Sequence, residues 1–344
     1  MTTNIDLNYV LNFTKELLEI PSPVGYTEKA KYRVIEELKK YNIPYFFNKK
    51  GTLIATIEGE NNLEGKMISA HIDTIGAMVK KIKSNGRLEL IQLGGIIWSG
   101  VEAENLKILT IDGKIFEGTL LPNKASAHVY GDDARTITRE ASTMEVRLDE
   151  EVYSKEDTEN LGISIGDFIA FDPRTVITKN GFIKSRFLDD KLCIGQIFGY
   201  IKFLKESKLK PKNKLYICFS DYEEIGYGVS YIPEDAKEFI ALDIGLVSPD
   251  SQGDEKKVAI TIKDNRAVYD LDIRKKMMEI CKNNNIKYTT DIYNRYSSDA
   301  SVVVQRGADI KIACIGPSVD ASHHYERTHI SGVLEVIKLL INYL

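Results

Sequence analysis

The sequence has few cysteines, one tryptophan and no long hydrophobic run, and these scarcities exclude several classes of protein. The four cysteines, Cys193, Cys218, Cys281 and Cys314, are widely spaced and form no CxxC pair, which argues against a disulfide framework and a thiolate zinc site. Nowhere do eighteen apolar residues run together, so we expect no membrane-spanning helix. The formal net charge is only −4, and therefore no nucleic-acid partner is expected.

The beginning of the sequence has neither a basic segment nor a long apolar segment, both of which a secretory signal needs. We therefore expect the protein to stay in the cytoplasm. With 344 residues, 43% of them hydrophobic and 28% charged, the chain is long enough for one large core and a second domain.

The sequence patterns of both ends of the chain are typical of an α/β domain. Apolar residues recur at helical or strand spacing, and prolines 21 and 23 end the first helix. The predicted helices cover residues 7–20, 27–41, 190–205, 269–284 and 333–344, and the predicted strands cover 45–47, 52–57, 66–70, 215–220, 239–242 and 310–315.

The middle of the chain differs from both ends. From about residue 87 to 177 it consists of short alternating segments broken by Gly, Asp and Pro, with little helical periodicity. This texture predicts an all-β insertion. The insertion splits one α/β domain into two segments, residues 1–86 and 178–344.

Candidate ligands for a metal follow the predicted strands. In open α/β sheets the binding crevice lies beyond the carboxyl ends of the strands. The strand at 66–70 ends on His71-Ile72-Asp73, the strand at 215–220 runs into Glu223-Glu224, and the strand at 239–242 ends on Asp243. The pair Asp189-Asp190 precedes a helix, and a cluster of histidines (His323, His324 and His329) precedes the last helix.

Each of these features also has an ordinary structural explanation. His71 and Asp73 are compatible with a hydrogen-bonded turn, Asp189-Asp190 with a helix N-cap, and Asp243 with a turn. Their joint occurrence at one edge of a sheet favours a shared metal site. Imidazole and carboxylate ligands without thiolates suit zinc, cobalt or manganese, and two ions about 3.5 to 4 Å apart need a bridging carboxylate.

Six segments of the chain, in this order, resemble the M42 family of metallo-aminopeptidases, the group of glutamyl aminopeptidases and tetrahedral TET peptidases. The resemblance covers nearly the whole chain. It implies a three-layer α/β catalytic domain of the zinc-peptidase type with an inserted all-β dimerisation domain. The matching segments are Ser69 to Gly76, Phe187 to Lys191, Asp221 to Gly226, Ala241 to Asp243, Ser298 to Ala300 and Tyr325 to His329.

The resemblance also implies a role for each candidate residue. His71 and Asp243 would each bind one of two divalent ions, Asp189 would bridge them, and Glu224 and a late histidine would complete the ligands. Asp73 would orient His71 through its other ring nitrogen. Glu223 would be the general base that takes a proton from a metal-bridging water and passes it to the leaving amine.

The match departs from the family at Lys191, where the family usually has Arg, and it is ambiguous at the late histidine. We expect His329 to be that ligand, with His323 next, and the remaining histidines to face substrate or solvent. Asp299 resembles a family position near the substrate pocket, although a helix N-cap or a turn is an equal alternative. Asp299 and His323 are therefore the expected substrate-binding residues.

The expected activity is removal of N-terminal residues from short peptides, with zinc or cobalt as the ions and manganese as a further choice. A related two-metal amidohydrolase acting on small N-acyl amino acids would use the same ligands and is the alternative. An inactive scaffold would lack a ligand or the base, and here all candidates are present. The resemblance further implies dimers built through the β insertion, which in the family are often gathered into twelve-subunit shells.

Overall fold

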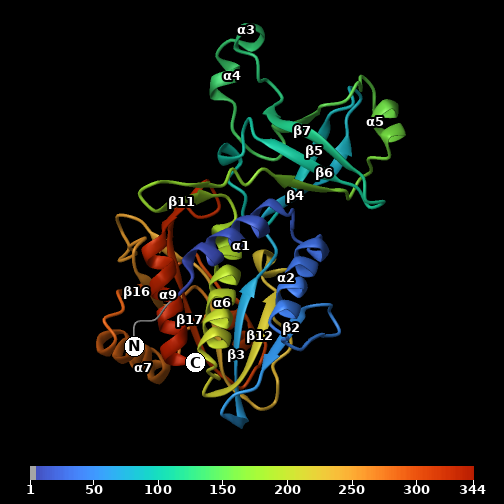
Figure 1. Cartoon of the computed structure of the whole chain (residues 1–344). Coiled ribbons are helices and arrows are strands. Elements are labelled where there is room, and N and C mark those ends of the chain that lie inside the picture. Colours follow the sequence, from blue (N-terminus) through green and yellow to red (C-terminus); the bar gives the residue numbers. More distant parts are fainter. Residues whose placement is uncertain (1–4) are drawn as a thin grey trace.

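The computed structural model describes residues 5–344 of the chain. These residues form two β-sheets. A large mixed sheet lies among helices, and a small closed barrel stands above it at one end (Figure 1). The expected fold class, an α/β domain with an inserted all-β domain, is confirmed. No helix in the described residues is long and apolar enough to cross a membrane.

The large sheet has twelve strands, and its centre is parallel. Strands β12, β3, β13 and β17 lie side by side in this order and all run in one direction. Its main path is β1 (Tyr45–Phe47), β2 (Leu53–Ile57), β12 (Asn213–Ser220), β3 (Asn61–His71), β13 (Ala236–Leu242), β17 (Lys311–Asp320), β18 (Glu326–His329), β11 (Phe182–Ser185) and β10 (Val176–Ile177); β14 (Gly245–Val247), β15 (Val258–Lys263) and β16 (Tyr288–Ile292) extend it beside β17.

Helices cover both faces of this sheet. Alternate residues of β3 show the division, because Ile68 and Ala70 pack into one apolar cluster and Met67 packs into another. The first cluster lies under α1 (Leu7–Glu19), α2 (Glu28–Lys40), α6 (Leu188–Ser207), α7 (Leu271–Asn283) and α9 (Ile330–Tyr343), and the second lies under α8 (Asp299–Gln305). The central strands are buried on both sides, as their continuous apolar runs require.

The barrel closes in the strand order β4-β5-β8-β7-β6-β9. Ala77 and Val79 of its first strand are buried and Met78 between them is less buried, which is the alternation of a half-buried strand. A register shift between Val79 and Lys81 then leaves both Lys80 and Lys81 exposed. Its elements are β4 (Gly76–Ile82), β5 (Leu88–Leu93), η1 (Trp98–Gly100), β6 (Asn105–Leu109), β7 (Ile115–Pro122), α3 (Ala127–Tyr130), α4 (Asp133–Thr136), β8 (Met144–Leu148), α5 (Lys155–Leu161) and β9 (Phe168–Phe171).

The barrel begins earlier than the predicted start of the insertion at residue 87. Strand β4 already belongs to it, so the insertion starts at Gly76. The turn at residues 84–86, directly before the predicted boundary, is the hairpin turn between β4 and β5. At the other end the prediction was closer, because β9 ends at Phe171 and β10 already pairs in the large sheet.

Candidate metal centre

Four segments converge at the carboxyl edge of the parallel sheet. His71 is the last residue of β3, and it lies beside Ser220 at the end of β12. Glu223 and Glu224 follow in the short helix η2 (Glu223–Ile225), and Asp243 directly follows β13. Asp189 lies at the beginning of α6. The parallel register places these side chains at one edge, where a crevice in such sheets forms.

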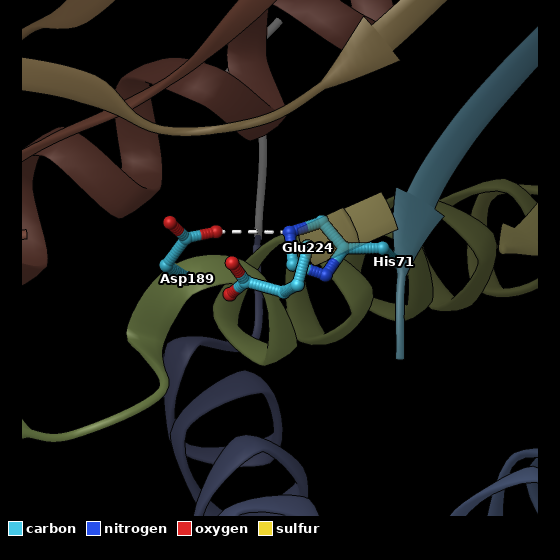
Figure 2. A group of neighbouring side chains, drawn as sticks. All are labelled: His71, Asp189 and Glu224. Atoms are coloured by element: carbon cyan, nitrogen blue, oxygen red, sulfur yellow. Dashed lines mark hydrogen bonds and ion pairs between the residues drawn. The ribbon is translucent and has the colours of Figure 1, made fainter. Parts of the chain in front are cut away.

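Asp189 lies between two imidazoles and turns one carboxylate oxygen toward each. Its Oδ1 is 2.9 Å from His71 Nε2, and its Oδ2 is 3.5 Å from His323 Nε2. Glu224 Oε2 lies 3.3 Å from the same nitrogen of His323. Figure 2 shows the carboxylates of Asp189 and Glu224 pointing into the space beside the His71 ring. Asp189 therefore lies between the two imidazoles and faces both.

Three overlapping groups of side chains could hold an ion. In each group, one ligand atom from every residue lies within 4.8 Å of the others. His71, Asp189 and Asp243 each occur in two of the groups. The groups are His71 with Asp189 and Glu224, His71 with Glu223 and Asp243, and Asp189 with Asp190 and Asp243.

The cluster carries more negative charge than the protein neutralises. Burial, together with repulsion from neighbouring carboxylates, raises the pKa of Glu223, Asp243 and Asp190 well above the ordinary range. No lysine or arginine in residues 5–344 forms an ion pair with any of these carboxylates. Asp190 Oδ1 is buried and has no hydrogen-bond partner among the described residues. Buried carboxylates of this kind fit bound cations, and the donor set fits divalent metals.

Backbone carbonyls fix the orientation of both imidazoles. His71 Nδ1 lies 2.9 Å from the carbonyl oxygen of Asp73, and His323 Nδ1 lies 3.1 Å from that of Gly95. A carbonyl oxygen only accepts, so each Nδ1 carries the proton. In the neutral ring, Nε2 then keeps its lone pair for the centre, which is the arrangement of a metal ligand.

Asp73 contacts the other ring nitrogen of His71, but through its backbone carbonyl. Its carboxylate is 3.7 Å from the His71 ring nitrogen, and the carbonyl of the same residue orients His71 instead. The carboxylate accepts hydrogen bonds from the backbone N–H groups of Glu223 and Glu224, at 3.2 Å each. Burial raises the pKa of Asp73 to about 6. Asp73 therefore holds both glutamates as well as His71.

The expected late ligand, His329, lies outside the cluster. Its Nε2 is 2.9 Å from the carbonyl oxygen of Asn180, and its Nδ1 accepts from Ser331 N at the beginning of α9. His323, which was the second candidate for the late ligand and an expected substrate contact, lies at the cluster instead, with its Nε2 atom near Asp189 and Glu224. His323 has a φ of 61°, a backbone conformation that is uncommon for a non-glycine residue and that sequence periodicity does not reveal.

Asp299 does not present a free carboxylate to a substrate. It is 3% exposed, and its two oxygens accept from Ser220 Oγ and Val229 N. The preceding residue, Ser298, is the N-cap of α8. The expected substrate contact is therefore corrected to an internal one.

Lys191, the departure from the family pattern, lies away from the carboxylates. Its Nζ donates to the carbonyl oxygens of Leu17, at 2.8 Å, and Ile20, at 2.6 Å, at the end of α1. The ammonium therefore caps a helix C-terminus, and this role does not require the bidentate geometry of arginine.

Sequence reasoning missed Glu326 as a supporting residue. Its buried carboxylate accepts from the backbone N–H of Asp189, at 3.1 Å, and from that of His323, at 3.0 Å. It therefore joins two candidate ligands that are far apart in the sequence. The one available signal was its place within the Tyr325 to His329 segment of the family resemblance.

Known proteins share this fold over nearly the whole chain. The family model described as M42 glutamyl aminopeptidase matches residues 51–339. A Bacillus subtilis protein named "Putative aminopeptidase YhfE" is 41% identical over 97% of this chain and 96% of its own length. The TET aminopeptidase from a marine sediment thaumarchaeon superposes with a TM-score of 0.87 at 18% identity, covering 97% of this chain and 96% of its own.

A further structural neighbour is the TET1 peptidase of Pyrococcus horikoshii. It superposes with a TM-score of 0.83 at 23% identity, over 97% of this chain and 98% of its own, and it is described as assembling into a tetrahedron or a large octahedral shell. The family match and the 41% identical relative carry the assignment, and the structures confirm the fold. The chain therefore belongs to the M42 glutamyl aminopeptidase family of peptide hydrolases.

Proposed function

We propose that this chain is a two-metal aminopeptidase that removes N-terminal residues from short peptides. The observation that carries the proposal is the position of Asp189, whose two carboxylate oxygens face the Nε2 atoms of His71 and His323. Such a carboxylate is suited to serve two ions at once. We place the reaction in the cytoplasm.

Five residues would hold the two ions. Asp243 and His71 would serve one ion, Glu224 and His323 the other, and Asp189 both. Zinc or cobalt suits these imidazole and carboxylate donors best, and manganese is also compatible. Two divalent ions here would polarise the scissile carbonyl and make the attacking water more acidic.

Glu223 is the proposed general base. Its Oε2 lies 3.9 Å from His71 Nε2, so its carboxylate is beside the ligands, and its side chain is 11% exposed. From this position it would take the proton of the attacking water and deliver it to the nitrogen of the leaving amine. The carboxylates around it favour a substrate with a free, positively charged α-amine.

The alternative activity is hydrolysis of small N-acyl amino acids by the same residues. An N-acylated substrate lacks the positive amine that the carboxylate cluster would attract. The 41% identical relative is named as an aminopeptidase, which also supports the peptide reaction.

Assembly into dimers through the barrel is part of the proposal, with a closed shell of twelve subunits as its largest form. The tetrahedral and octahedral assemblies described for the Pyrococcus horikoshii TET1 peptidase support the closed shell. Light scattering would measure the mass in solution.

The first experiment measures cleavage of a panel of aminoacyl-p-nitroanilides and their N-acetylated counterparts. The protein is stripped with a chelator and then resupplied with zinc, cobalt or manganese. Metal-restored cleavage of only the free-amine substrates would support the proposal. Cleavage of only the acetylated set would favour the amidohydrolase, and no cleavage of either set would favour an inactive scaffold.

A further inference from the structure

One buried carboxylate ties both ends of the loop that carries Glu223 and Glu224. Asp299 Oδ2 accepts from Ser220 Oγ at 2.5 Å, and Asp299 Oδ1 accepts from Val229 N at 2.9 Å. Ser220 is the last residue of β12, and Val229 lies beyond the turn that follows η2. Asp299 itself belongs to α8, which is distant in the sequence. The two hydrogen bonds therefore close the 220–229 loop against a separate helix.

The loop backbone approaches this carboxylate as closely as a glycine allows. A Cβ added at Gly228 would lie 2.1 Å from Asp299 Oδ1, so any other residue at 228 would force the loop and the carboxylate apart. Asp299 is 3% exposed and forms no ion pair anywhere in residues 5–344. Burying a carboxylate without a cation is costly, and the two hydrogen bonds are its only direct compensation.

The loop between these two ends is under conformational constraint. Tyr222, with φ 68°, and Gly226, with φ 80°, both occupy the left-handed region. Such strained backbone conformations persist only where several surrounding contacts hold them in place. Two further contacts act on the same loop, since Lys50 Nζ donates to the carbonyl of Tyr227 at 2.7 Å and Arg306 Nη2 donates to that of Gly226 at 2.9 Å.

We propose that Asp299 is a positioning residue, which sets the place of Glu223 and Glu224 by closing the ends of their loop. It acts as a hydrogen-bond acceptor, and it touches neither substrate nor metal. The inference rests on the proposed role of Glu223 as the general base, because only then does a displaced loop slow the reaction.

Asparagine and alanine at position 299 separate this role from a role of the negative charge. In Asp299→Asn the side-chain oxygen still accepts from Val229 N, and the amide donates to Ser220 Oγ, so the loop stays closed without the charge. In Asp299→Ala both hydrogen bonds are lost. Ser220→Ala removes one of them and serves if the alanine variant at 299 fails to fold. Glu335→Ala is the control, because Glu335 is a buried carboxylate of α9 that accepts from the backbone N–H of Lys287 and also pairs with Lys338.

We expect Asp299→Asn to keep kcat within about threefold, and Asp299→Ala to lower kcat by about 100-fold with little change in KM, since a small displacement of a catalytic group is enough for such a loss. Asp299→Asn should keep the wild-type metal content, whereas displacement of Glu224 in Asp299→Ala should weaken binding of one ion, so kcat is measured with zinc in excess. Equal loss of kcat in the asparagine and alanine variants would overturn the proposal, and so would a wild-type kcat in Asp299→Ala.

Hydrogen–deuterium exchange tests the same inference without any activity. Backbone amides of residues 220–229 should exchange at least about tenfold faster in Asp299→Ala than in the wild type, Asp299→Asn or Glu335→Ala, because opening of the loop controls their protection. Unchanged exchange in Asp299→Ala would contradict the positioning role. This measurement stands even where the peptidase assay fails, so the failure of the proposed function and of this inference can be told apart.

Discussion

The two sides of the candidate metal centre are built differently. On the sheet side, His71 and Asp243 stand at the ends of parallel strands and are only 2% and 4% exposed. On the loop side, Glu224 belongs to the short helix η2 and His323 to a turn, and their side chains are 4% and 33% exposed. Backbone pairing within the sheet fixes the first side. The second side depends on contacts made by other segments, and these include the barrel.

Glycines of the barrel form the wall of the loop side. A Cβ added at Gly94 would lie 3.3 Å from Glu224 Cβ, and one added at Gly95 would lie 2.8 Å from His323 Nδ1. Both glycines directly follow strand β5 of the barrel. The inserted domain therefore takes part in positioning two candidate ligands, and the sheet side has no equivalent dependence on Gly94 and Gly95.

The largest expected effect is that of Glu223→Gln. This variant tests the proton transfer separately from metal binding on either side of the centre. Glutamine keeps the shape of the side chain and removes its ability to accept a proton. We expect kcat to fall by roughly 1,000-fold, within the range for loss of a general base. Metal content, measured by mass spectrometry of the purified variant, should stay unchanged. Loss of an ion together with activity would make Glu223 a ligand and contradict its role as base.

A pair of histidine variants tests the loop side next. His323→Ala should weaken binding of one ion by at least about 100-fold, because it removes a proposed ligand and not only a supporting contact. His329→Ala should leave both ions bound and cost about 1 kcal/mol of stability, because it removes the cap of α9. Calorimetric titration with zinc measures the first effect, and urea denaturation measures the second. Metal loss in the His329 variant alone would restore the original ligand assignment.

Gly95→Ala tests whether the barrel positions the loop side of the centre and not the sheet side. The added methyl group must displace the His323 ring, so we expect roughly tenfold weaker binding of one ion and no change for the other. Gly118→Ala is the control, because its methyl group would lie 2.7 Å from the carbonyl oxygen of Arg147 in the barrel wall. Equal weakening of both ions by Gly95→Ala would show that the two sides do not differ in their dependence on the barrel.

Lys191→Met should have the smallest effect on the centre and act on stability alone. Two carbonyls at the end of α1 lose their donor, which costs about 1–3 kcal/mol. Burial lowers the pKa of Lys191 to about 7, from an ordinary value of 10.5. The folded state thus binds this proton less tightly than the unfolded chain, and wild-type stability rises as the pH increases from about 7 toward 10.

The gap in stability between wild type and Lys191→Met should therefore widen over that pH range. Urea denaturation at several pH values measures it, with zinc affinity as the accompanying control. A gap that narrows with rising pH would mean that the buried amine stays charged.

Most of the centre was predictable because strand ends are predictable. Apolar runs locate β3, β12 and β13, and parallel pairing then brings His71, Glu223 and Asp243 to one edge. The choice between His323 and His329 was not predictable in this way. Both precede the last helix, and two left-handed residues between β17 and β18, Ala321 and His323, decide which imidazole turns inward.

The predicted start of the barrel was wrong because the local sequence does not mark the true start. Strand β4 continues the chain directly from Asp73 with no turn signal strong enough to mark a change of domain. The hairpin at residues 84–86 carries the stronger signal, although it lies inside the barrel.

The sequence by itself determined the class of the fold, the edge of the sheet at which chemistry gathers and the residue types that gather there, because these follow from periodicity and from strand direction. Only the tertiary structure decided which carboxylate oxygen faces which imidazole, that Asp73 and Asp299 hold the loop of the glutamates, and that Gly95 of the barrel orients His323. Those contacts join residues far apart along the chain, and their geometry depends on backbone conformations that no local pattern encodes.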